Sequence, residues 1–139
     1  MSKEQDEFQR KTWDKSVTGT DIPALDSEIA FDEDTQPLMW LVVAKPITQR
    51  GAVLQITHGV IIGRQGDIRW TDPRMSRQHA RFALTPHPED SQRMVYSIMP
   101  VQDRNGTMVN GEQIASKTLL KENDEIVMGD TYFIVKVLE

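Results

Sequence analysis

The stretch GRQGDIRWTDPRMSRQHAR, residues 63–81, is the part of the sequence on which the fold prediction depends. It carries two acidic residues, Asp67 and Asp72, although the whole chain has a formal net charge of −5. Gly, Asp and Pro divide it into turns, which is typical of a loop between short strands. A local excess of cations can attract an anion even in an acidic protein. The excess comes from five arginines: Arg64, Arg69, Arg74, Arg77 and Arg81.

Short apolar runs recur on both sides of this stretch. They are rich in β-branched and aromatic residues, which fit a pleated and half-buried surface. In the last run, Phe133, Val135 and Val137 lie on one face and Lys136 lies on the other, which is a period of two. So many short strands without a convincing helical pattern predict an all-β sandwich or barrel. We predict strands at 39–44, 52–56, 59–63, 67–70, 80–84, 94–99, 107–110, 117–120, 125–129 and 132–138.

The N-terminal part of the chain has a different composition. Residues 1–38 carry ten acidic and four basic residues, whereas residues 39–139 carry 11 acidic and 12 basic residues. A segment of low hydrophobicity and high charge cannot bury enough apolar surface to offset the entropy cost of ordering. We therefore predict a largely disordered acidic tail at 1–37 and one folded domain at 38–138.

Composition also narrows the possible classes of protein. The chain has no cysteine, which excludes disulfides and cysteine catalysis and fits a reducing compartment. Its three histidines have no paired ligand spacing, so we expect no metal and no cofactor. No apolar run approaches the roughly 20 residues of a membrane helix, and the first residues lack the apolar core of a secretory signal. We expect a cytoplasmic, monomeric protein that does not bind membranes.

Four short motifs lie at predicted loops: Gly63-Arg64, Ser76-Arg77-Gln78-His79, Arg104-Asn105-Gly106-Thr107 and Asn110-Gly111. Each has a purely structural explanation when taken alone, because Asn-Gly is a common hairpin turn and a lone histidine is commonly a structural hydrogen-bonding group. Together they suit an anionic ligand. Arginine presents planar, bidentate donors to phosphate, serine adds a hydroxyl donor, and asparagine can hold a peptide main chain.

In this order, the four motifs resemble the forkhead-associated (FHA) domain family. The resemblance covers about residues 38–138, including the last two predicted strands in ENDEIVMGDTYFIVKV. It implies an eleven-strand β-sandwich whose loops at one end bind phosphothreonine in an extended peptide. The implied function is phosphothreonine-dependent protein–protein interaction in Ser/Thr-kinase signalling.

The resemblance also implies roles for single residues. Arg64 and Ser76 match positions that contact the phosphate, and Arg77 matches one that touches phosphate or peptide main chain. Asn105 matches the position that holds the peptide main chain. Arg104 stands where many members have serine or threonine, and it could add a phosphate contact. The implied loop-structuring residues are Gly63, His79, Gly106, Thr107, Asn110 and Gly111. We assign Arg69, Arg74 and Arg81 to the rim or to solubility.

Other interpretations remain open on the sequence alone. The tail threonines Thr18 and Thr20 are candidate phosphosites through which the chain could bind itself. An FHA scaffold could instead bind a protein partner without phosphate. A nucleic-acid binder is disfavoured because the domain is nearly neutral and the tail is acidic. An enzyme with a triad of Ser76, His79 and Asp103 is disfavoured because Ser76 and His79 are local loop neighbours and no nucleophile elbow is present.

Overall fold

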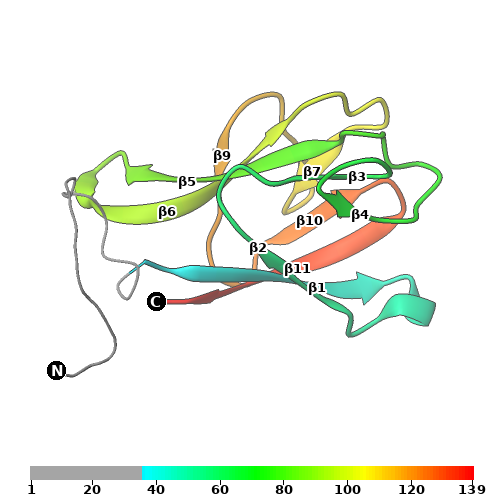
Figure 1. Ribbon diagram of the computed structural model, residues 1–139, viewed down its shortest axis with the longest axis horizontal. Helices are drawn as coiled ribbons and strands as arrows, with labels where there is room; N and C mark the ends of the chain where they lie inside the picture. Colours follow the sequence, from blue (N-terminus) through cyan, green and yellow to red (C-terminus); the bar gives the residue numbers. More distant parts are fainter. Residues whose placement is uncertain (1–35) are drawn as a thin grey trace, which may run out of the picture. The chain divides into compact units, whose positions relative to one another are not determined.

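The computed structural model describes residues 36–139, which form eleven β-strands and one 3-10 turn (Figure 1). The strands are β1 (Leu38–Lys45), β2 (Val53–Ile56), β3 (Ile61–Gly63), β4 (Ile68–Arg69), β5 (Ala80–His87), β6 (Asp90–Pro100), β7 (Thr107–Val109), β8 (Glu112–Gln113), β9 (Thr118–Leu119), β10 (Glu125–Met128) and β11 (Thr131–Leu138), and the turn is η3 (Ile47–Gln49). The predicted tail, with Thr18 and Thr20, lies outside the described residues. Within 36–139, no helix is long and apolar enough to cross a membrane.

The strands form two sheets. One has six strands in the order β2-β1-β11-β10-β7-β8, and the other has five in the order β4-β3-β5-β6-β9. Nearly all neighbouring strands run antiparallel, and β3 and β4 run parallel. The prediction of an all-β, eleven-strand sandwich is confirmed.

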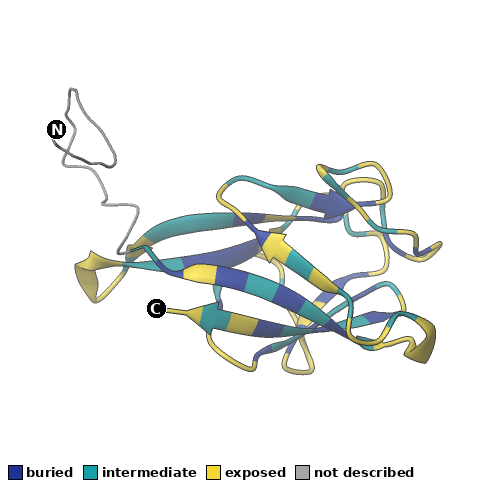
Figure 2. Cartoon of the chain, turned by 60° about the horizontal axis from the view of Figure 1, so that its bottom comes forward, coloured by how far each residue is buried: buried dark blue, intermediate teal, exposed yellow. Residues whose placement is uncertain are grey.

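The core lies between the two sheets, and it follows from the alternation of side chains along each strand (Figure 2). In β1, Met39, Leu41 and Val43 are buried, and in β11, Phe133 and Val135 are buried. Side chains of this kind each contribute about 1.5–3 kcal/mol when they are fully buried. The opposite sheet contributes Ile62, Phe82 and Ile98 to the same core.

The strand predictions differ from the structure in two places. The strand β8 was not predicted, because its two residues are exposed and polar and pair only with β7. The strands predicted at 80–84 and 94–99 are too short, because β5 continues through His87 and β6 begins at Asp90. Cross-strand pairing extends this hairpin into residues that have no apolar alternation.

This hairpin determines which loops meet. Because β5 and β6 are antiparallel partners, the loop that precedes Ala80 and the loop that follows Pro100 lie at the same end of the sandwich. The turn between His87 and Asp90 lies at the other end (Figure 1). The arginine-rich stretch and the Asn105 motif are therefore neighbours in space.

Candidate functional site

An open groove of about 800 Å³ lies at the end of the sandwich where these loops meet. It receives residues from three segments: the residue that follows β3, the loop before β5 and the loop after β6. All five residues predicted to contact a phosphopeptide line it. The complete lining is Arg64, Pro73, Arg74, Met75, Ser76, Arg77, Gln102, Asp103, Arg104 and Asn105.

Arg64 is exposed, and its side chain is held by the neighbouring loop. Its Nε donates a hydrogen bond to the carbonyl oxygen of Met75 at 2.7 Å, and its main-chain N–H donates to Ser76 O at 3.1 Å. The Nε bond fixes the direction of the guanidinium while its terminal N–H groups stay available as donors. Arg64 is therefore a preoriented cation at the edge of the groove.

Ser76 joins two of the loops. Its main-chain N–H donates to Nδ1 of His79 at 3.0 Å, and its Oγ accepts a hydrogen bond from the main-chain N–H of Arg104 at 3.0 Å. Because Oγ acts as an acceptor there, its own hydrogen is still free to donate to a ligand.

His79 is fully buried, and its ring connects the same two loops. Its Nδ1 accepts the N–H of Ser76, so the ring proton sits on Nε2 and is donated to the carbonyl oxygen of Gly106 at 3.0 Å. Burial lowers the pKa of His79, against smaller raising effects from the Gly106 carbonyl and from the carboxylates of Asp103 and Asp72. The neutral ring is the form that fits both partners.

Asn105 forms a third link across the groove. Its Nδ2 donates to the carbonyl oxygen of Arg74 at 2.8 Å. This bond uses one amide hydrogen and leaves the Oδ1 lone pairs for an N–H group of a ligand. The loop behind Asn105 is held by Thr107, whose buried hydroxyl donates to Oδ2 of Asp103 at 3.0 Å.

Gly63 is required by a close approach of main chain. An added Cβ would lie 2.2 Å from the carbonyl oxygen of Arg77 and 2.7 Å from that of Ser76. The absence of a side chain lets residues 64 and 65 bond to that loop, since Gln65 N–H donates to Arg77 O at 2.8 Å. Gly106, in contrast, has a φ of 86°, which favours glycine.

Asp72 is a supporting residue that the sequence analysis did not identify. It is buried, and its Oδ2 accepts the Thr131 hydroxyl at 2.6 Å and the Asp130 N–H at 2.8 Å. Its Oδ1 accepts the Arg74 N–H at 2.9 Å. Burial raises the pKa of Asp72, but the bonds from Thr131, Arg74, Asp130 and Met75 outweigh it, so the pKa is lowered. These partners lie up to 59 residues away in the sequence, which is why no local pattern indicated this role.

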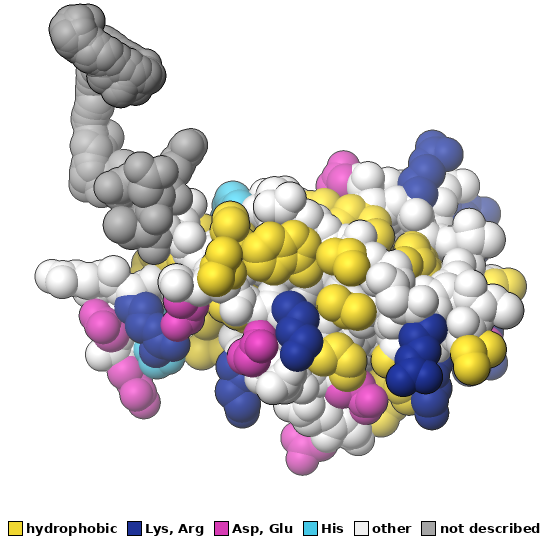
Figure 3. All heavy atoms as spheres, turned by 90° about the horizontal axis from the view of Figure 1, so that it is seen from below, with side chains coloured by type: hydrophobic (Ala, Val, Ile, Leu, Met, Phe, Trp, Pro, Cys, Tyr) yellow, Lys and Arg dark blue, Asp and Glu magenta, His cyan; other side chains and the backbone are white. Residues whose placement is uncertain are grey.

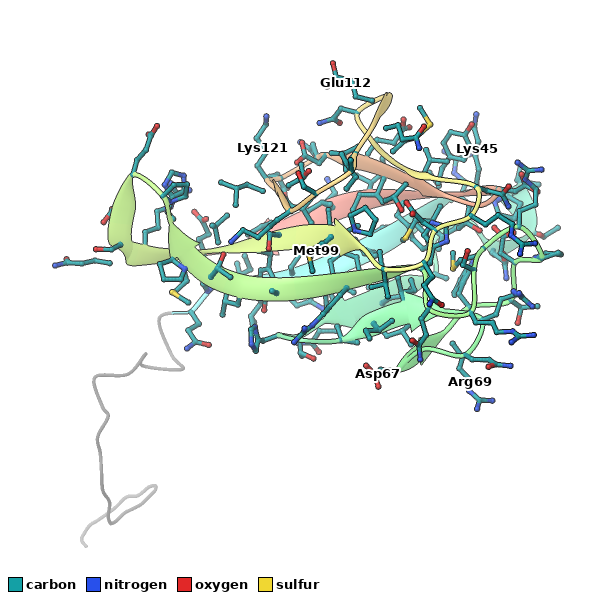
Figure 4. All side chains as sticks on the ribbon, turned by 90° about the horizontal axis from the view of Figure 1, so that it is seen from above. Lys45, Asp67, Arg69, Met99, Glu112 and Lys121 are labelled. Atoms are coloured by element: carbon teal, nitrogen blue, oxygen red, sulfur yellow. The ribbon has the colours of Figure 1, made fainter. Side chains whose placement is uncertain are left out.

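The groove carries a positive charge. Four arginines line it, Asp103 is the single acid among the lining residues, and the Arg74 guanidinium also pairs with Asp130 at 3.2 Å. Arg74 was assigned to the rim, yet it lines the groove and its carbonyl holds Asn105. Arg69 lies on β4 outside the lining, pointing away from the body of the domain (Figure 4). The site suits an anion flanked by extended peptide.

The Asn110-Gly111 motif forms the two-residue turn between β7 and β8. Both residues have positive φ, 53° and 84°, as expected for a type I′ turn. The Asn110 side chain also donates to Asp124 Oδ1 at 2.9 Å and accepts the Glu125 N–H at 3.0 Å. The motif is therefore a structural turn, outside the groove lining.

The geometry of Ser76, His79 and Asp103 does not form a catalytic relay. Both ring nitrogens of His79 are occupied by main-chain groups, and Ser76 Oγ accepts from Arg104 N–H. Asp103 accepts from Thr107 instead of orienting the imidazole. Among residues 36–139 there is also no group of three or more potential metal ligands.

Comparison with known proteins agrees with this geometry. The family model for the FHA domain matches residues 60–129, just over half of the 139 residues. The human protein "Angiogenic factor with G patch and FHA domains 1" is 29% identical over 135 residues, covering 86% of this chain. This chain spans only 18% of that relative's length.

Solved structures share the fold. A chain from "Structural and functional analysis of phosphothreonine-dependent FHA domain interactions" is 27% identical, with a TM-score of 0.57, and the match covers 71% of this chain and 95% of that one. Mycobacterium tuberculosis EmbR, solved in complex with a low affinity phosphopeptide, is 25% identical with a TM-score of 0.57. That match covers 71% of this chain and 24% of EmbR.

Proposed function

Because the chain belongs to the FHA domain family, whose members are phosphothreonine-dependent interaction modules, we propose that its groove binds a phosphothreonine of a partner protein. The observation that carries the proposal is the convergence of Arg64, Ser76, Arg77, Arg104 and Asn105 on one positively charged groove. The partner belongs to a Ser/Thr-kinase signalling process, since a kinase must supply the phosphate.

Different residues of the groove contact different parts of the ligand. Arg64 and the hydroxyl of Ser76 donate to the phosphate oxygens, and Arg77 and Arg104 add positive charge on either side. Asn105 holds the main chain of the extended peptide through its free Oδ1 lone pairs. The support is the donor set itself, because charge-assisted donors from a preoriented arginine match the three acceptor oxygens of a phosphate.

The energies favour a phosphorylated ligand. A phosphothreonine carries roughly −1.5 to −2 charges near pH 7, whereas threonine offers one hydroxyl. Each charge-assisted hydrogen bond contributes about 1.5–3 kcal/mol net, so the loss of several bonds corresponds to discrimination of about a hundredfold or more. Association entropy absorbs part of this gain, which leaves an affinity on the order of micromolar.

We infer an interaction module and no hydrolytic activity at this groove. The support is that Ser76 Oγ and both nitrogens of His79 are engaged with main-chain groups, so no base is positioned to activate the serine.

The test is a titration of the full chain, followed by amide NMR shifts, with phosphothreonine peptides and their unphosphorylated counterparts. The set includes a peptide of residues 12–26 phosphorylated at Thr18 or Thr20. We expect shifts at 63–64, 75–79 and 103–107 with phosphorylated peptides only. Failure of every phosphopeptide to shift these loops would leave phosphate-independent binding of a partner as the function.

Substitutions in the arginine-rich stretch make the test specific. Arg64→Ala is expected to weaken phosphopeptide binding by about ten- to a hundredfold, from the loss of one or more charge-assisted bonds. Arg69→Ala is the matched control, because it removes an arginine from the same stretch that does not line the groove. Equal losses in the two variants would indicate general electrostatic attraction and contradict a built phosphate site.

A further inference from the structure

The outer face of the six-stranded sheet is unusually apolar. An antiparallel sheet that covers a core on one side normally presents polar side chains on the other. Here the neighbouring strands β1 and β11 present large apolar side chains outward, and β2 adds another. We call the set of Trp40, Val42, Val53, Tyr132, Ile134 and Leu138 the apolar sheet face.

The strand registers place these residues side by side. Val42 pairs with Ile134 on one side and with Val53 on the other, which makes a continuous apolar row across three strands. Each residue of this set is next in its strand to a residue that is buried in the core or, for Leu54 and Val137, packed against it, so all of them point away from the core. Val53 and Leu138 remain 57% and 58% exposed. Figure 3 shows hydrophobic side chains gathered over this face.

The opposite face of the domain differs. On the five-stranded sheet, Arg81 stands between Ile61 and Met99 in one outward row, and Val95 pairs with Thr85 in another. Met99 is 42% exposed on β6 (Figure 4). Charged and polar side chains therefore interrupt the apolar ones on this sheet, whereas the row of Val53, Val42 and Ile134 on the other sheet is continuous.

The charges around the apolar sheet face identify the kind of partner that fits. Lys136 stands among its residues and contacts Asn123 Oδ1 at 2.6 Å and Glu122 at 3.7 Å. Glu125 lies beside Ile134 on β10, and Lys45 lies at the end of β1. Because cations and anions are interspersed, a twofold axis can bring the lysine of one copy near a glutamate of the other. A strongly charged partner would gain little from this mixture.

The dimensions allow a small interface. β1 and β11 have eight residues each, and β2 and β10 have four each. At ~3.3 Å per residue and ~4.8 Å between strands, these four strands have a flat projection of about 400 Å². This is about half of the roughly 800 Å² per partner of a standard interface, a size that corresponds to weak, transient association.

We propose that two copies of this chain associate face to face through the apolar sheet face, as a weak symmetric dimer. The two sheets pack against each other as aligned sheets do in sandwiches. The groove is built from loops at the end of the sandwich, outside this face, so both grooves stay open. The expected dissociation constant is on the order of tens of micromolar.

The test is sedimentation velocity of the full chain over concentrations from about tenfold below to tenfold above that constant. We expect the sedimentation coefficient to rise from monomer to dimer. Val53→Glu and Leu138→Glu, each at an exposed position of the face, are expected to raise the dissociation constant at least about tenfold, because a carboxylate would be desolvated in the interface. Met99→Glu is the matched control on the other sheet and is expected to change the dissociation constant by no more than about twofold.

A second measurement uses the unmodified chain, so it tests the proposal even if a variant unfolds. On dilution of the unmodified chain, amide NMR shifts should change in residues 38–45 and 131–138. A chain that stays monomeric throughout, whether because its own tail or nothing at all covers the face, overturns the proposal. Concentration-dependent shifts confined to the groove or to β5 and β6 overturn it as well.

Discussion

Gly63 is the point at which two loops of the site come closest. The main-chain carbonyls of Ser76 and Arg77 occupy the space that any side chain at this position would fill. The φ of Gly63 is not left-handed, so the requirement for glycine comes from contact and not from conformation. The same contact holds the Arg64 main chain against the loop of Ser76 and Arg77.

The expected effect of Gly63→Ala is a loss of about 1–3 kcal/mol in the free energy of unfolding, because backbone on both sides must move to admit a methyl group. Phosphopeptide affinity should fall with it, since Arg64 and Ser76 would separate. Urea unfolding and peptide titration measure the two effects. Gly51→Ala is the comparison, because Gly51 has a φ of 93° and no atom lies within 4 Å of an added Cβ. Backbone strain alone should therefore lower the stability of this variant, and its phosphopeptide affinity should be unchanged. A stable Gly63→Ala protein with full affinity contradicts this account.

The sequence identified the residues that line the groove better than those that support it. Arg64, Ser76, Arg77, Arg104 and Asn105 were predicted from motifs, and all five line the same groove. Motifs carry such information because these five residues lie in three short segments, each of which contains one motif. Asp72 was missed, since its partners Asp130 and Thr131 become neighbours only after the strands pair.

The loop between β4 and β5 is attached to the turn between β10 and β11 by side-chain bonds and not by a β-ladder. Asp72 is the central residue of this attachment, and Trp70 extends it by donating its Nε1–H to Oγ1 of Thr131 at 3.1 Å. Gly129 allows the close approach, because an added Cβ would lie 2.7 Å from Oδ2 of Asp72. The position of Ser76 in the groove therefore depends on a turn of the other sheet.

Asp72→Asn is expected to destabilise the fold by about 1–3 kcal/mol, because an amide NH₂ would replace one carboxylate oxygen and face a donor. Phosphopeptide affinity should also decrease, as the Arg74 main chain loses its support. Thermal unfolding and peptide titration provide the measurements. Asp90→Asn is the control, since Asp90 is exposed and its Oδ1 accepts from Gln92 N–H at 3.2 Å, within its own turn. An Asp72→Asn protein that unfolds like the control would rule out this role.

Strand prediction succeeded where burial imposes a pattern and failed where it does not. β1 and β11 were predicted because both are apolar runs rich in β-branched and aromatic residues. β8 and the start of β6 are exposed, and only pairing with a neighbour makes them strands. The apolar sheet face was not predicted, because the strand order that assembles this face is not contained in local sequence.

The stability of the whole domain should depend on pH through His79. Its pKa in the folded state is lowered from the ordinary value of 6.5, chiefly by burial. As the pH falls through 6.5, the unfolded chain takes up this proton before the folded chain does. The contribution of neutral His79 to the free energy of unfolding is therefore fully present above pH 6.5 and decreases below it. Asp72 acts in a separate window: its lowered pKa gives stability that is present above 3.8 and is lost below it.

The measurement is urea unfolding of the ligand-free chain between about pH 5 and pH 8, because a phosphopeptide titrates near pH 6 and would obscure the effect. His79→Gln should give a lower stability and a shallower dependence on pH. His87→Gln, which changes a histidine of the β5–β6 turn, is the control. An unfolding free energy that stays constant as the pH falls from 6.5 to 5 would refute the role of His79.

The hydrogen bonds that join the loops of the groove have a consequence for the speed of recognition. Ser76, His79 and Asn105 connect the loops in the free protein, so a ligand meets a site that needs little rearrangement. Different phosphopeptides should then arrive at similar rates, and their affinities should separate through how long each remains bound. A kinase that phosphorylates a partner would set the start of the interaction, and the residence time in the groove would set how soon a phosphatase can end it.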